Sequence, residues 1–136
     1  AEGPYHVQHD LQTMMQDLVG IVRREEEMQE ALTKLIVLRK RAEKVGAVGN
    51  REYNPAWHTA MDLGNLITIS EAIARSALDR KESRGGHFRD DHPEKDPVAA
   101  KYNVVVRRGA DGSMRLSREP IPPLRPELAR IIEEEK

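Results

Sequence analysis

The chain has 136 residues, the length of one domain with one modest core. Its 22 basic and 23 acidic residues leave a net charge of -1, which excludes the basic surface typical of nucleic-acid partners. It contains no cysteine, which excludes disulfides, thiolate metal sites and a cysteine nucleophile.

No apolar run approaches the roughly 20 residues that span a bilayer, so we expect no direct membrane insertion. The N-terminus lacks the basic and then apolar profile of a signal peptide. The chain begins at Ala1, which is compatible with methionine removal or with a piece of a longer protein.

The first predicted helix covers residues 4–19, and Gly20 weakens its end. Apolar residues recur there at steps of three and four, which places them on one stripe. The stripe consists of Val7, Leu11, Met14, Met15, Leu18, Val19 and Val22. His6 and His9 are spaced to share a metal, but no further ligand completes a set.

The second predicted helix covers residues 24–46 and opens with acidic residues, which the positive end of a helix dipole favours. Its apolar seam consists of Met28, Ala31, Leu35, Leu38, Ala42 and Val45. Such a seam is typical of an antiparallel helix pair, or of a short coiled coil with another chain. Gly46 and Gly49 are expected to stop this helix.

The third predicted helix covers residues 55–82 and begins at Asn54-Pro55, because proline suits the first helical position. Its expected packing stripe consists of Trp57, Ala60, Met61, Gly64, Ile67, Ala74, Ala77 and Leu78. Gly64 predicts a closely packed neighbour. The fold prediction is therefore mainly α, with a spectrin-repeat-like, antiparallel three-helix bundle over residues 1–92.

A polar segment with two adjacent glycines follows this helix, and it is the stretch that most resembles a site. It consists of Glu82, Ser83, Arg84, Gly85, Gly86, His87, Phe88, Arg89, Asp90 and Asp91. The glycine pair is expected to end the third helix, and the arginines to pair with carboxylates or carbonyls. His87, Asp90, Asp91 and His92 imitate a metal site, but the arginines would repel a cation, so we predict none.

Residues 93–136 are predicted to form a proline-rich, extended tail with a β-hairpin at about 102–117. The hairpin is expected to lean on the helices, since a lone hairpin is marginally stable. Four prolines between Pro120 and Pro126 predict extended chain, and a short acidic helix is expected after them. No phosphate-binding loop, nucleophile elbow or paired acid and base is present in the sequence.

The run from Asn54 to Pro93 resembles the C-terminal helical region of succinate dehydrogenase and fumarate reductase flavoprotein subunits. The specific part is Arg80-Lys81-Glu82-Ser83-Arg84-Gly85-Gly86-His87, followed by Arg89-Asp90-Asp91. Asp10-Leu11-Gln12, Met15 and the later Leu124-Arg125-Pro126 also resemble that family.

This resemblance implies a longer parent that oxidises succinate to fumarate with FAD and passes electrons to an iron-sulfur subunit and a quinone. Its catalytic and flavin-linking residues would lie in an FAD-binding domain and a capping domain, so no catalytic, cofactor-binding or metal residue is assigned here. The chain would be a scaffold in a membrane-associated complex on the cytoplasmic face. The motif from Glu82 to Asp91, Phe88 apart, would lock this domain against the FAD-binding domain, and a contribution to the contact with the iron-sulfur subunit is the second choice.

Two alternatives remain open from the sequence. The C-terminal domain of L-aspartate oxidase is related, although the Gly-Gly-His-x-Arg-Asp-Asp run and the proline-rich tail favour succinate dehydrogenase. A free-standing helical interaction module would share only the fold and would use the seam of the second helix as a homodimer face.

Overall fold

The computed structural model describes residues 1–135. Its α-helices are α1 (Pro4–Leu18), α2 (Glu25–Ala42), α3 (Pro55–Asp79) and α4 (Pro126–Glu134), with a short 3-10 helix, η1 (Ala99–Lys101). Its strands are β1 (Val22–Arg23), β2 (Phe88–Arg89), β3 (Tyr102–Arg108) and β4 (Met114–Pro120). The prediction of a mainly α protein with a small antiparallel hairpin is confirmed.

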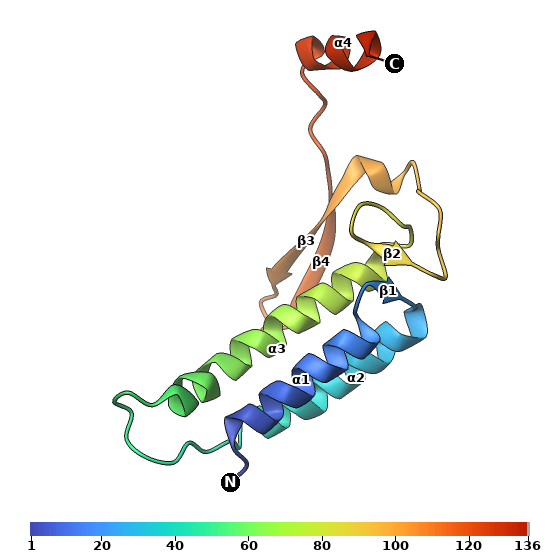
Figure 1. Ribbon diagram of the computed structural model, residues 1–136. Helices are drawn as coiled ribbons and strands as arrows, with labels where there is room; N and C mark the ends of the chain where they lie inside the picture. Colours follow the sequence, from blue (N-terminus) through green and yellow to red (C-terminus); the bar gives the residue numbers. More distant parts are fainter. Residues whose placement is uncertain (136) are drawn as a thin grey trace.

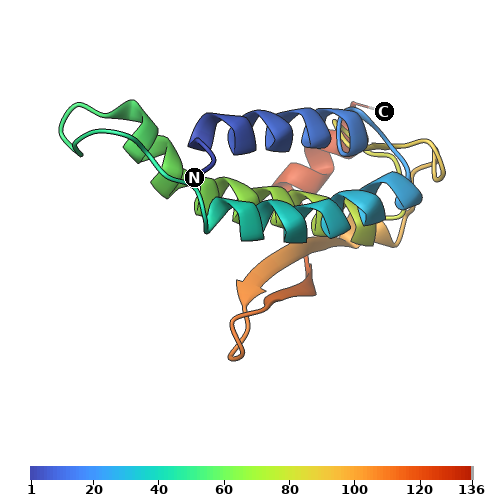
Figure 2. The same ribbon diagram turned by 90° about the horizontal axis from the view of Figure 1, so that it is seen from below.

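The helices α1, α2 and α3 lie side by side and share one hydrophobic core (Figures 1 and 2). Its fully or nearly fully buried side chains are Val7, Leu11, Met14, Val19, Met28, Ala31, Leu35, Leu38, Leu63, Ile67, Ala74 and Ala77. Aliphatic side chains and alanines fill this core, as the low aromatic content indicates. Among the described residues, no helix is long and apolar enough to cross a membrane.

The helix α1 begins at Pro4, which needs no amide partner at this position, and ends at Leu18. The prediction that Val22 extends its apolar stripe was wrong, because Val22 lies in β1 and is 53% exposed. The chain leaves the helix after Val19 and pairs as a strand instead.

The seam of α2 is confirmed, because its first four apolar residues are buried in the core of this same chain. The homodimer face that the seam suggested is therefore already covered by α1 and α3. The helix ends at Ala42 rather than at residue 46, and Gly46 instead donates its amide to the Glu2 carbonyl.

The side chain of Asn54 caps α3 by accepting a hydrogen bond from the Trp57 amide at 3.3 Å. The packing stripe of α3 was predicted only in part. Leu63 and Ser70, which were not in the predicted stripe, are buried, whereas Met61, which was, is 61% exposed. Gly64 is exposed, and a side chain there would meet nothing within 4 Å. The predicted close neighbour of Gly64 is therefore absent from the described part of the chain.

The strands β3 and β4 form an antiparallel hairpin in which Tyr102 pairs with Pro120 and Arg108 with Met114. The hairpin contacts α3, where Arg118 binds Asp79 through two hydrogen bonds of 3.0 and 3.1 Å. It thus leans on the helices, as its marginal stability in isolation requires. Beyond it, an extended segment carries α4 away from the body (Figure 1).

The core position of Leu35 gives a first test. Leu35 is 3% exposed, so Leu35→Ala leaves a cavity and should lower the free energy of unfolding by about 2 to 5 kcal/mol. A urea melt measures this change. The matched surface control is Ile36→Ala, because Ile36 is 60% exposed on the same helix. A loss below about 0.5 kcal/mol for Leu35→Ala would contradict the core assignment.

Candidate functional site

The polar segment lies at the end of the molecule where α1 and α3 finish and α2 begins. There β1, which follows α1, pairs in parallel with β2, which lies within the segment (Figure 1). Val22 pairs with Phe88 and Arg23 with Arg89, and the Asp90 amide donates to the Arg23 carbonyl at 2.9 Å. We call this region, residues 19–25 together with 80–96, the junction.

Arg89 closes the end of α3. Its side chain is fully buried, and its Nη1 donates to the carbonyls of Ala77, Leu78 and Arg80 at 3.1, 3.3 and 3.4 Å. The last carbonyls of a helix have no partners within the helix, and they mark the negative end of its dipole. A buried guanidinium therefore satisfies these groups and complements their charge.

Asp91 connects this cap to the next helix. Its two carboxylate oxygens accept from Arg89 Nε and Nη2, both at 2.7 Å. The same carboxylate accepts from the Glu25 amide at 3.0 Å, in the first turn of α2. The Arg89 hydrogen bonds hold the pKa of Asp91 well below its usual range. One ion pair thus caps the end of α3 and the beginning of α2.

Arg23 makes the corresponding link to α1. Its Nε donates to the Gly20 carbonyl at 2.8 Å, just beyond the end of that helix. Its Nη1 lies 3.0 Å from Nδ1 of His87, whose Nε2 lies 3.0 Å from the Arg80 carbonyl. Arginine can only donate, so Nδ1 accepts and the proton is on Nε2. Burial lowers the pKa of His87, which favours this neutral form.

Glu82 is the second buried charge of the junction. Its fully buried carboxylate accepts from Arg84 Nε at 3.1 and 3.2 Å, from the Asp96 amide at 2.8 Å, and from Arg80. These donors, with Arg84 the largest contributor, lower the pKa of Glu82 to about 2. Arg80 also donates to the Tyr102 carbonyl at 2.9 Å, so Glu82 helps to fix the start of the hairpin.

The glycine pair does not end α3, contrary to the prediction, because the helix stops at Asp79 and Arg80 is already extended. Instead, Gly85 and Gly86 form a tight turn in which Arg84 and His87 exchange backbone hydrogen bonds of 2.8 and 3.0 Å. Gly85 has a φ of +58°, a conformation that favours glycine. The buried Ser83 hydroxyl accepts the Arg89 amide at 2.8 Å and so fixes the base of this turn.

The predicted segment is therefore brought together as one network, in which two of its charged side chains, Glu82 and Arg89, are buried. Glu82, Ser83 and Arg89 are buried, Arg84 and His87 are half-buried, and Gly85, Gly86, Asp90 and Asp91 are exposed. Sequence reasoning missed the partners Arg23, Arg24, Glu25 and Asp96, and it named Arg80 only as part of the family run. The pair Arg23-Arg24 just before a helix start was a signal, since arginines are unfavourable next to the positive helix end unless carboxylates offset them.

Outside this network the junction presents apolar side chains. Ile21 is 79% exposed, Val22 53% and Phe88 38%, and the last two are paired neighbours in the β1–β2 sheet. We call this pair, Val22 and Phe88, the apolar face. Such a face, held by a rigid polar network beneath it, is suited to contact with another protein surface.

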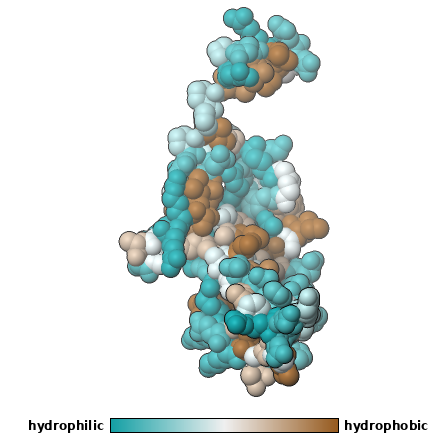
Figure 3. All heavy atoms as spheres, turned by 90° about the vertical axis from the view of Figure 1, so that its left-hand side faces the viewer, coloured by the Kyte–Doolittle hydropathy of each residue, from teal (hydrophilic) through white to brown (hydrophobic). Residues whose placement is uncertain are grey.

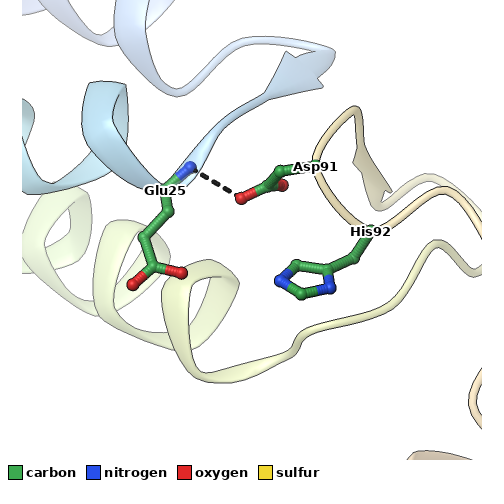
Figure 4. A group of neighbouring side chains, drawn as sticks. All are labelled: Glu25, Asp91 and His92. Atoms are coloured by element: carbon green, nitrogen blue, oxygen red, sulfur yellow. Dashed lines mark hydrogen bonds between the residues drawn. The ribbon is translucent and has the colours of Figure 1, made fainter.

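Glu25, Asp91 and His92 lie close enough for their ligand atoms to fall within 4.8 Å of one another, and Figure 4 shows how they lie. Both carboxylates already have cationic partners, however. Arg89 binds Asp91, and Lys81 Nζ lies 3.2 Å from Glu25. These cations offset the charge that would attract a metal ion, so the two carboxylates are part of the ion-pair network.

Comparison with known proteins shows which family the chain resembles. A family model described as fumarate reductase flavoprotein C-term matches residues 8–127. The succinate dehydrogenase flavoprotein subunit of Coxiella burnetii is 34% identical over 110 residues, which are 79% of this chain and 19% of that protein. L-aspartate oxidase of Yersinia pestis is 35% identical over 89 residues, 65% of this chain and 16% of that protein.

A solved structure of Mycobacterium smegmatis Sdh1 in complex with UQ1 matches with a TM-score of 0.87 and 43% identity. The match covers 98% of this chain and 23% of that chain. The chain therefore belongs to the family of fumarate reductase flavoprotein C-terminal domains. It spans about one fifth of the length of the curated relatives it matches.

The buried arginine of the junction gives a second test. Arg89→Met removes the cap of α3 and leaves Asp91 without its main partner, so it should cost about 3 to 5 kcal/mol of stability in a urea melt. Arg24→Met is the matched control, because its pair with Asp90 is exposed and should contribute at most about 1 kcal/mol. Equal losses in the two variants would refute the special role of Arg89.

The acid sensitivity of the junction gives a third test. The pKa of Glu82 is lowered in the folded state, so its ionised carboxylate stabilises the fold. This stabilisation is fully present above the ordinary carboxyl pKa and is lost as pH falls toward about 2. The free energy of unfolding should therefore fall between about pH 4.5 and 2, and Asp91 acts in the same direction. Urea melts across this range measure the slope.

Glu82→Gln should be less stable at neutral pH and should show a shallower slope in the same range. Glu52→Gln, at an exposed loop position, controls for the loss of one negative charge. An unchanged slope in Glu82→Gln would show that this carboxylate does not contribute to acid unfolding.

Proposed function

We propose that this chain is the C-terminal helical domain of a succinate dehydrogenase or fumarate reductase flavoprotein subunit, in which it acts as a scaffold. The family match and the named relatives support this assignment. The parent subunit would carry FAD, oxidise succinate to fumarate and pass electrons to an iron-sulfur subunit and a quinone. It would work on the cytoplasmic face of the membrane as part of a membrane-associated complex.

Within that subunit, residues 1–92 would form a spectrin-repeat-like, antiparallel three-helix bundle and residues 93–136 an attached tail. The shared core of α1, α2 and α3 supports this division. The bundle would hold the junction at one end, where it would contact the FAD-binding and capping portion of the subunit.

The observation that carries this proposal is the contrast between the inside and the outside of the junction. Arg89 and Glu82 are fully buried and paired, whereas Val22 and Phe88 expose apolar surface beside them. Paired and buried charges have little capacity left for another domain, but apolar surface gains from being covered. The motif would therefore act in interdomain contact through the apolar face that its charges hold in place.

L-aspartate oxidase is the second candidate for the parent, supported by the identity of the Yersinia pestis enzyme. That match covers less of this chain than the succinate dehydrogenase match does. Succinate or L-aspartate oxidation by the intact subunit would decide between the two.

A binding measurement tests the docking role. The tagged chain would be titrated with the separately expressed FAD-binding and capping portion of the same subunit, whose flavin absorbance reports that it is folded. Phe88→Ala should weaken binding about tenfold, because it removes an aromatic ring from the contact. Arg84→Ala should weaken it less, through loosening of the turn that carries Phe88.

Tyr5→Ala is the control, because Tyr5 is a 50% exposed aromatic residue in the first turn of α1 and thus outside the junction. Circular dichroism melts would verify that each variant is folded. If the unchanged chain binds and both Phe88→Ala and Arg84→Ala bind with the same affinity, the junction serves only the internal stability of this domain.

A further inference from the structure

The helix α4 makes no buried contact with the rest of the described chain. None of its residues is buried, and Leu128, Ile131 and Ile132 are 36%, 51% and 52% exposed. These three side chains are spaced by three and four residues and therefore share one face. Figure 3 shows apolar side chains gathered on this helix, which stands apart from the body.

The segment before α4 keeps the helix away from the body. Pro122 and Pro123 favour an extended backbone, and their missing amides prevent this segment from continuing the sheet after β4 ends at Pro120. The segment leaves the body next to the junction, because the Ile121 amide donates to the Lys101 carbonyl at 2.9 Å, while Arg80 binds the nearby Ala99 carbonyl. The segment that carries α4 therefore begins close to the junction, while α4 itself stands farther out (Figure 1).

An isolated helix of nine residues is not stable in water, since helices shorter than about 12 to 15 residues are marginal even with favourable sequences. Without a partner, the side chains of Leu128, Ile131 and Ile132 on α4 would also remain exposed. An apolar groove on another protein surface would both stabilise the short helix and cover its apolar side chains.

We infer that α4 docks through Leu128, Ile131 and Ile132 into an apolar groove with a basic rim on the FAD-binding and capping portion of the same subunit. The basic rim follows from charge, because residues 125–135 carry four glutamates, Glu127, Glu133, Glu134 and Glu135, and only two arginines, Arg125 and Arg130. The same acidic character disfavours an anionic membrane surface as the partner.

Two observations select this partner. About four fifths of the length of the matched relatives lies outside this chain, so a subunit of that kind has ample surface for the helix. The match to Mycobacterium smegmatis Sdh1 covers 98% of this chain and hence most of α4, so the segment has a counterpart in that larger chain. The inference rests on the proposed function, because it uses the same neighbouring portion that the junction would contact.

Hydrogen exchange of the intact flavoprotein subunit, measured by mass spectrometry without the iron-sulfur subunit, tests the inference. Amides of residues 128–134 should exchange at least about tenfold more slowly in the intact subunit than in this chain alone. Ile131→Ala combined with Ile132→Ala should abolish that protection, while alanine keeps the helix propensity high. Arg130→Ala combined with Glu133→Ala, on the polar face, is the matched control and should keep the protection.

Because α4 has no buried contacts, these changes should leave the melt of this chain unaltered. Equal exchange of α4 in the intact subunit and in this chain would overturn the inference. So would protection that appears only after the iron-sulfur subunit is added, or only at concentrations at which the subunit dimerises. If the Phe88 titration shows binding while α4 stays unprotected, the proposed function stands and this inference alone fails.

Discussion

The ion pair between Arg89 and Asp91 is the interaction on which the rest of this domain depends. The last carbonyls of a helix need donors from outside the helix, and its first amides need acceptors. Arg89 provides the first for α3 and Asp91 provides the second for α2, and the two side chains bind each other. Two helices that share only an aliphatic core could slide along it, whereas a pair that caps both of them fixes their ends at one place.

The same pairing determines what the junction offers to other proteins. Because Glu82 and Arg89 are consumed within the network, the outward-facing side chains of β1 and β2 are the apolar Val22 and Phe88, beside the exposed ion pair of Arg24 and Asp90. A conspicuous motif of charged residues thus leaves part of the surface above it apolar. The segment before α4 follows a similar logic, since Pro122 and Pro123 lack the backbone amides that would pair it with the hairpin.

The helices and the hairpin could be predicted because their signals are local. The apolar steps from Met28 to Leu38, the Asn54-Pro55 start and the glycine-rich turn each determine structure within a few residues. The junction could be predicted only as a polar site, because its partners are distant in sequence: Arg24 and Asp90 are 66 residues apart. Val22 was misassigned because a two-residue strand has no periodicity of its own, and Gly85 because a glycine pair after a helix is compatible with a cap or with a turn.

The parallel pairing of β1 with β2 has a consequence for the order of folding. One strand follows the first helix and the other follows the third, so their backbones can meet only after the helices have packed. Contacts between residues so far apart carry a large loop-closure cost and form late. Phe88 and Val22 therefore become neighbours only when β1 and β2 have paired, and a chain in which only the helices have formed lacks that surface. Under the proposed function, docking onto the rest of the subunit would then require complete folding.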